Sequence, residues 1–134
     1  MTYIARRGDA FLIDTSNDKH LFVIVTGADK NGMHLLLSVS TIHPEARNVD
    51  RTCEIPAGVH DFTKRPSFVY YRKPEQRSAA HIGKCVDGRG FVPKEPVVPE
   101  PRERMCPGIL TSIQTPRWAE DFYRQFISPR ARKD

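Results

Sequence analysis

Residues 20–39 have the sequence HLFVIVTGADKNGMHLLLSV, and this stretch decides the fold class. It begins with the apolar, β-branched run 21–25 and ends with a second apolar run at 34–39. Between them, residues 29–32 predict a turn, because asparagine and glycine tolerate the left-handed backbone conformations that tight turns require. The stretch therefore predicts two strands joined by a short connection.

Further short apolar runs extend the predicted sheet on both sides of this pair of strands. A strand at 10–14 precedes it, so that the first three strands form a meander, and three more short strands are predicted at 52–55, 67–71 and 79–82. Strands at such close intervals are typical of a small antiparallel barrel. We expect residues 8–83 to form one strongly bent antiparallel sheet that closes toward a barrel.

The C-terminal part of the chain predicts a connector followed by helices. Residues 93–101 have the sequence PKEPVVPEP, and four prolines in nine residues predict an extended surface connector. A helical segment is predicted over residues 108–128. Within it, Thr115 is the expected N-cap and Pro116 the first residue of the clearer helix. The apolar face of that helix, expected to pack on the barrel, carries Trp118, Phe122 and Phe126.

Length and composition indicate one globular domain, residues 1–134. The chain is 39% hydrophobic and 28% charged, an ordinary balance for a folded protein. Its three cysteines are widely spaced and form no CxxC pair, which predicts reduced thiols rather than a disulfide framework or a zinc knuckle. The N-terminal apolar runs are too short for a signal peptide or a membrane span, so a cytoplasmic protein without membrane association is expected.

Positive charge is concentrated in the middle of the chain. The net charge is +5, and residues 64–94 contain eight Lys or Arg against two Asp or Glu, interspersed with aromatic residues. Basic and aromatic side chains together suit phosphate groups and stacked bases. The alternative is a solvated edge of the sheet whose aromatic residues lie in the core. The candidate RNA-binding residues in this segment are Lys64, Arg65, Arg72, Lys73 and Arg77.

The order of elements and several stretches resemble the PemK/MazF family of toxin endoribonucleases, which are small SH3-like barrels of type II toxin–antitoxin modules. Residues 6–14, RRGDAFLID, are similar to the family's first strand, which begins with Gly-Asp or Gly-Glu after a basic residue. Residues 20–26, HLFVIVT, look like its second strand, and residues 35–41, LLLSVST, look like its third, which ends in hydroxyl residues. The resemblance covers the first half of the chain in its residues and the remainder in its architecture.

The resemblance implies a metal-independent endoribonuclease that cleaves single-stranded RNA without a cofactor. It also implies a homodimer and a cognate antitoxin that occupies the RNA-binding groove. One departure concerns mechanism: the family's second strand usually begins Arg-Pro, and its arginine contributes to cleavage, whereas this chain has His20 and Leu21 there. Lys19, also a candidate RNA-binding residue, or Arg51 is the cation that would replace it, and the His20 imidazole would transfer a proton.

Metal-free RNA cleavage needs a base for the ribose 2′-hydroxyl, donors that stabilise the phosphorane, and an acid for the departing 5′-oxygen. Histidine suits both proton-transfer roles at neutral pH. The resemblance implies that the candidates converge at one mouth of the barrel. Each has a structural alternative, such as a surface histidine, an Asx turn or a strand-ending hydroxyl. The candidate catalytic residues are His20, His60, Ser40, Thr41 and Arg51.

Other histidines have weaker functional patterns. His34 and His81 lie in apolar runs and are predicted to be structural. A zinc site built from His43, His60 and Cys53 lacks the characteristic spacing of zinc ligands. Two functions therefore remain in competition, the endoribonuclease toxin and a non-catalytic SH3-like barrel that binds nucleic acid or a protein partner. The residue that separates them is His20, which stands in place of the family's arginine.

Overall fold

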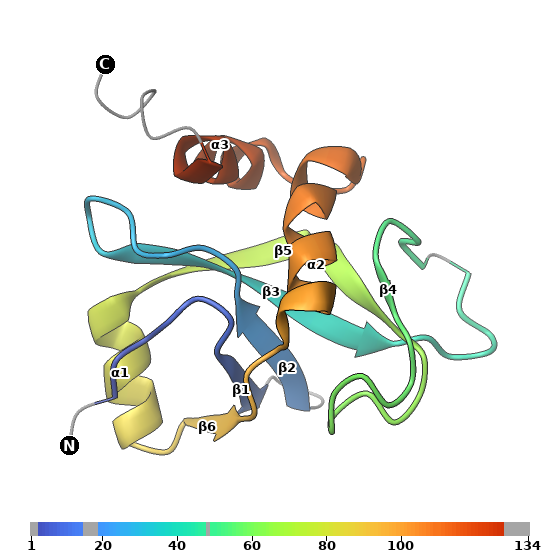
Figure 1. Ribbon diagram of the computed structural model, residues 1–134, viewed down its shortest axis with the longest axis horizontal. Coiled ribbons are helices and arrows are strands. Elements are labelled where there is room, and N and C mark those ends of the chain that lie inside the picture. The colour runs from blue at the N-terminus through green and yellow to red at the C-terminus, as the bar shows by residue number, and fades with distance from the viewer. Residues whose placement is uncertain (1–2, 15–18, 48, 128–134) are drawn as a thin grey trace.

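The computed structural model describes residues 3–14, 19–47 and 49–127 (Figure 1). In these ranges the elements, in chain order, are β1 (Ala10–Asp14), β2 (Lys19–Ile24), β3 (Met33–Thr41), β4 (Glu54–Ile55), β5 (Ser67–Ser78), α1 (Ala79–Asp87), β6 (Phe91–Lys94), α2 (Pro99–Thr111) and α3 (Arg117–Ile127). The predicted mainly β fold with a C-terminal helix is confirmed. None of the helices in the described ranges has the length and apolar character that crossing a membrane requires.

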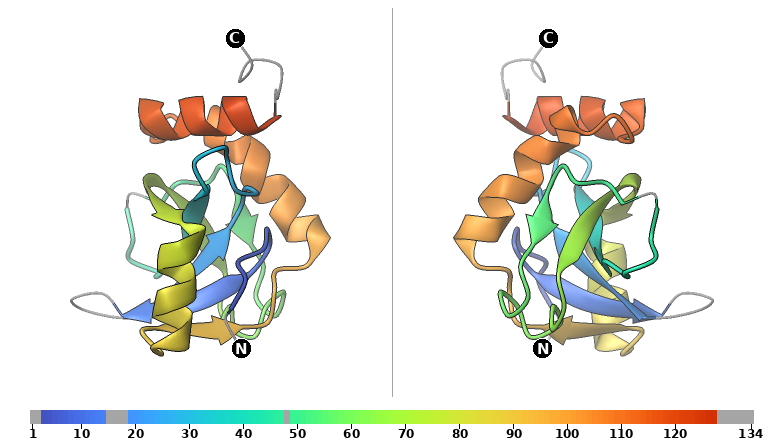
Figure 2. Two further views of the ribbon diagram at one scale, coloured as in Figure 1. Left: turned by 90° about the vertical axis from the view of Figure 1, so that its left-hand side faces the viewer. Right: turned by 90° about the vertical axis from the view of Figure 1, so that its right-hand side faces the viewer.

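The strands form one antiparallel sheet in the order β4-β5-β3-β2-β1-β6. The predicted meander is confirmed, because β1, β2 and β3 are successive neighbours. The turn before β3 is also where the sequence places it: Gly32 has a φ of +75°, and Asp29 Oδ1 accepts hydrogen bonds from the backbone N–H groups of Asn31 and Met33. The sheet is strongly bent into a half-barrel (Figure 2).

A large bulge in β5 contributes to this bend. The β3–β5 register pairs Leu36 with Glu75 and Ser38 with Tyr70, so residues 71–74 of β5 lie opposite Leu37 alone. The bulge contains Pro74, which has no backbone N–H for the ladder. As a result, the side chains on either side of the bulge point in directions that differ from those in a regular strand.

Apolar side chains cover both faces of the sheet. Successive residues of a strand point to opposite faces. On one face, alternate residues of β2 and β3 such as Val23 and Leu37 join a core with Met105 and Ile109 of α2 and with residues of α3. The other face carries a smaller core that packs under α1 and consists of Phe11, Phe22, Ile24, Leu36, Ile82 and Phe91. The two cores place α1 and α2 on opposite sides of the sheet (Figure 2).

The strand predicted at 79–82 is wrong, because these residues begin helix α1. Ser78 is the N-cap of that helix, and its Oγ accepts a hydrogen bond of 3.0 Å from the backbone N–H of His81. His81 therefore lies on an exposed helix and not in a strand, whereas His34 is buried in β3. A four-residue stretch with three apolar residues does not distinguish a strand from the first turn of a helix, and the preceding serine was the deciding signal.

The proline-rich segment 93–101 is extended only in part. Its first two residues belong to β6, an edge strand, where Pro93 is opposite Phe11 of β1. Helix α2 begins at Pro99, and not at residue 108 as predicted, because proline is well tolerated in the first turn of a helix. The connector between the two elements is therefore residues 95–98.

Helix α3 packs on the core as predicted, but its most deeply buried side chains are not those predicted. Its buried residues are Ala119 and Tyr123, while Trp118 is 42% exposed. Phe122 and Phe126 pack against the core only in part, and the Arg7 guanidinium lies 5.2 Å from the centre of the Phe126 ring. The buried face is thus displaced by one residue from the aromatic stripe that the sequence suggests.

Candidate functional site

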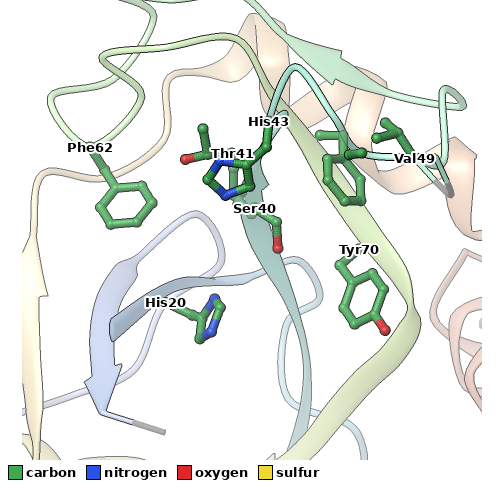
Figure 3. Close-up of a pocket in the computed structure, with 10 residues that line it drawn as sticks. His20, Ser40, Thr41, His43, Val49, Phe62 and Tyr70 are labelled. Carbon is green, nitrogen blue, oxygen red and sulfur yellow. The ribbon is translucent and has the colours of Figure 1, made fainter. Parts of the chain in front are cut away.

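A pocket of about 430 Å³ opens where β3 ends (Figure 3). Its polar lining consists of His20, Ser40, Thr41, His43 and Tyr70, and its apolar lining consists of Val39, Ala46, Val49, Phe62 and Phe68. We call it the His43 pocket. It combines two imidazoles and three hydroxyl groups with aromatic rings, a combination suited to both proton transfer and base stacking.

A second pocket of about 300 Å³ adjoins the first. The two share His20, Ser40 and Tyr70, so these residues lie between the two spaces. The second pocket, called the Ser38 pocket below, is further lined by Phe22, Ser38, Lys73 and Glu75. The Ser38 pocket therefore has one cation and one carboxylate in its lining, and the His43 pocket has neither.

Strand alternation explains why these side chains meet. Leu21 of β2 pairs with Val39 of β3. Because the strands are antiparallel, the next positions, His20 and Ser40, lie opposite each other. On β5, Tyr70 pairs with Ser38. These positions belong to the face of the sheet that packs under α1, because Phe22 is part of the core on that face and also lines the Ser38 pocket. The same face is therefore apolar beneath α1 and polar beyond it.

Three of the five candidate catalytic residues come together as expected. His20, Ser40 and Thr41 all line the His43 pocket. Figure 3 shows the Ser40 side chain in the region between the rings of His20 and His43, with the Tyr70 hydroxyl on the opposite side of the hollow. His43 was missed as a catalytic candidate because it follows the end of β3, where strand alternation no longer predicts the direction of a side chain.

His60 lies apart from these residues and makes structural contacts. Its ring Nε2 lies 2.8 Å from the carbonyl oxygen of Glu95, and its Nδ1 accepts a hydrogen bond of 3.0 Å from the backbone N–H of Phe62. A neutral imidazole with its proton on Nε2 satisfies both contacts. The residue is only 7% exposed. It lines another pocket, of about 270 Å³, which also includes Lys64 and shares only Phe62 with the His43 pocket.

The basic candidates do not form one continuous face. Lys73 lines the Ser38 pocket, whereas Arg72 beside it and the loop residues Lys64 and Arg65 are exposed outside both pockets. Arg51 forms an exposed ion pair of 3.0 Å with Glu54 and lines neither pocket. The remaining two are Arg77, which contacts Glu75, and Lys19, which begins β2 but whose side chain lies outside the described part of the structure.

The zinc ligands considered from the sequence also do not converge. Cys53 is buried in the core under α2, His60 is held against Glu95, and His43 lines its own pocket. Among the described residues, no group of three or more histidine, cysteine, aspartate or glutamate side chains is arranged to hold a metal ion. The chemistry available to the two pockets is therefore that of their imidazoles, hydroxyls, ammonium and carboxylate.

Comparison with known proteins does not place the chain in a family. No protein-family model matches it, and no curated protein sequence matches it. Any conclusion about function therefore depends on the residues and geometry of the site.

Proposed function

We propose that this protein is a metal-independent endoribonuclease of the PemK/MazF type, with an SH3-like barrel, that cleaves single-stranded RNA at the His43 pocket. The observation that carries the proposal is that two histidines, His20 and His43, line one pocket together with the Ser40 hydroxyl. Two imidazoles suffice for the two proton transfers of the reaction.

The reaction is a transesterification. One imidazole takes the proton of the ribose 2′-hydroxyl, and the 2′-oxygen attacks the neighbouring phosphorus. The bond from phosphorus to the 5′-oxygen breaks, and the second imidazole, in its protonated form, gives its proton to that oxygen. The products are a 2′,3′-cyclic phosphate and a free 5′-hydroxyl. The negative charge that develops on the phosphate is stabilised by hydrogen bonds from hydroxyl groups, which take over the role of the family's arginine. The hydroxyl groups in the pocket are those of Ser40, Thr41 and Tyr70.

The lining of the His43 pocket supports a single-stranded substrate. Phe62, Phe68 and Tyr70 offer aromatic rings to a nucleobase. A base can enter such a pocket only when it is unpaired and turned away from its neighbours. The net charge of +5 and the ammonium of Lys73 in the adjoining pocket favour an anionic ligand.

The assignment of the second histidine differs from the one expected from the sequence. His43, and not His60, is proposed as the partner of His20, because the contacts of the His60 ring engage both of its nitrogens. Arg51 has no proposed role, since it is paired with Glu54 away from the pockets. A cognate antitoxin and a homodimer remain proposals that follow from the resemblance to the toxin family.

A cleavage assay with a chelator tests the proposal. Purified protein is incubated with fluorescently labelled single-stranded RNA in excess EDTA, and the RNA ends are identified by their susceptibility to a cyclic phosphodiesterase and a polynucleotide kinase. We expect cleavage to persist and to leave a 2′,3′-cyclic phosphate. A folded protein that cleaves no RNA, and whose expression does not slow bacterial growth, would favour the non-catalytic barrel that binds nucleic acid or a protein partner.

A further inference from the structure

The Ser38 pocket contains polar groups that the proposed cleavage does not use. Ser38 is only 5% exposed, and it lines the pocket. A serine hydroxyl can both donate and accept a hydrogen bond, so this group is suited to a polar ligand that fills the pocket. Lys73 and Glu75 line the same space.

The Glu75 carboxylate is an oriented hydrogen-bond acceptor. It directly follows the β5 bulge, and its Oε1 is contacted by the Arg77 guanidinium. Because an ionised carboxylate has about four acceptor positions, this contact leaves positions on both oxygens for a ligand. Arg77 is thus a positioning residue for Glu75. Lys73 adds an ammonium group that donates but does not accept. The pocket therefore presents a pair of acceptors beside a donor.

Guanine is the RNA base that best complements this arrangement. On its Watson–Crick edge, the N1–H and the exocyclic N2 amine are adjacent donors, and O6 beside them is an acceptor. Adenine and cytosine each present one donor group, the exocyclic amine, and uracil presents one N–H between two carbonyl groups. Only guanine offers both carboxylate oxygens a donor while offering an ammonium an acceptor. The ring of Tyr70, which is shared by the two pockets, adds a surface for stacking.

We propose that the Ser38 pocket binds a guanine base of the RNA, with Glu75 accepting from N1–H and N2, and Lys73 donating to O6. This inference rests on the proposed function, since it names a base that the RNA substrate must carry. The two pockets share His20, Ser40 and Tyr70, so the bound guanine lies next to the phosphate that is cleaved. The protein is then selective for guanine beside the cut.

A binding experiment with a substrate that cannot be cleaved separates recognition from catalysis. The probes are two fluorescein-labelled, 2′-fluoro hexanucleotides, which have no 2′-hydroxyl nucleophile. One contains a single guanine, and the other contains inosine at that position, which retains N1–H and O6 but lacks the N2 amine. Fluorescence anisotropy should show that the wild-type protein binds the guanine probe about tenfold more tightly, as expected for one hydrogen bond to a charged group.

Glu75→Gln tests whether the carboxylate is responsible for this difference. In that variant the ratio of the two affinities should fall to about twofold or less, because a neutral amide accepts more weakly and at one atom only. Glu100→Gln is the matched control, since Glu100 is an exposed carboxylate paired with Arg104 on α2. That control should retain the wild-type ratio. If Glu75→Gln does not fold, the comparison of the two probes on the wild-type protein still decides the matter.

The outcomes distinguish this inference from the proposed catalysis. Equal affinity of the wild-type protein for both probes overturns the guanine assignment, even if the protein cleaves RNA. A guanine preference that survives Glu75→Gln also overturns it. A preference that depends on Glu75 in a protein that does not cleave RNA supports the pocket assignment and contradicts the proposed reaction. Failure to bind either probe overturns both.

Discussion

The hydroxyl of Tyr71, on β5, donates a hydrogen bond of 2.6 Å to the carbonyl oxygen of Met105 on α2. Burial raises the pKa of Tyr71 well above its usual range, and Cys53 beside it adds to the shift, so the phenol remains a protonated donor. The contact is close because Gly108 on α2 has no side chain: the Tyr71 ring and hydroxyl occupy the place where a Cβ atom would lie. This fit fastens α2 to the sheet.

Gly108→Ala is therefore expected to destabilise the protein by about 1–3 kcal/mol, the usual cost of overpacking a core. Urea unfolding followed by circular dichroism measures the change in the free energy of unfolding. Gly27→Ala is the control, because a Cβ atom on Gly27 would meet only an ordinary contact of 3.7 Å with the Phe126 ring. Equal stability of the two variants would show that α2 shifts freely on the sheet.

His60→Ala is expected to lower stability and to leave the cleavage rate of the folded protein nearly unchanged. The substitution removes the partner of the Glu95 carbonyl and of the Phe62 backbone N–H, and each lost hydrogen bond costs about 0.5–1.5 kcal/mol. The two readouts are the urea midpoint and the single-turnover cleavage rate below that midpoint. A folded His60→Ala protein that cleaves about a hundredfold more slowly would restore His60 as a catalytic residue.

Strand periodicity predicted one part of the site and not the rest. Alternation along β2 and β3 predicts that His20 and Ser40 share a face of the sheet. The antiparallel register of these adjacent strands then places the two residues opposite each other. The position of Lys73 and Glu75 depends on the β5 bulge, in which residues 71–74 oppose one residue of β3. The sequence carries only Pro74 as a signal of that bulge. From the sequence, Lys73 was therefore expected on a general basic face and not in a pocket, and Glu75 was not considered.

The helices, like the site, were predicted from the sequence only in part. The C-terminal helix was predicted from its apolar spacing, because that pattern extends over three turns. Helix α1 was missed, since three of its first four residues are apolar and the signal for its start is the single N-cap Ser78. The early start of α2 was missed for the opposite reason, because Pro99 was taken to prevent a helix that it in fact begins.

The stability of the protein should decrease in acid through Asp50. Burial alone would raise the pKa of this carboxylate, but hydrogen bonds from the Ser112 hydroxyl at 2.5 Å and from the Thr52 hydroxyl and backbone outweigh it and hold the pKa below its usual value. The unfolded chain therefore binds a proton at a higher pH than the folded protein does. The stabilisation is present above the unfolded pKa and is lost as pH falls through the folded pKa.

Asp50→Asn tests this dependence. We expect the variant to be less stable than the wild-type protein near neutral pH and the difference to shrink toward about pH 3, measured as urea midpoints across the range. Asp61→Asn is the control at an exposed carboxylate. A difference between Asp50→Asn and wild type that does not change with pH would contradict the role given to the charged form of Asp50.

RNA binding should weaken as salt rises, and Arg72 should contribute to it without regard to sequence. Arg72 is exposed and precedes Lys73, which lines the Ser38 pocket. Arg72→Glu is expected to weaken binding to all single-stranded probes about equally and to reduce the slope of log affinity against log salt by about one or two. Arg117→Glu, an exposed arginine at the start of α3, is the matched control. Affinity that ignores both salt and Arg72 would show that the basic segment only solubilises the protein.

The two pocket histidines should each be required for cleavage, and together they should act as one unit. His20→Ala and His43→Ala are each expected to lower the single-turnover rate by about 10²–10⁴-fold, the usual contribution of a positioned acid or base. The double variant should lose little more than the worse single variant, because one proton transfer without the other does not complete the reaction. His81→Ala is the control at an exposed histidine of α1 that lines neither pocket. Losses that simply multiply, or a folded single variant with the full rate, would mean that the two imidazoles do not share the reaction.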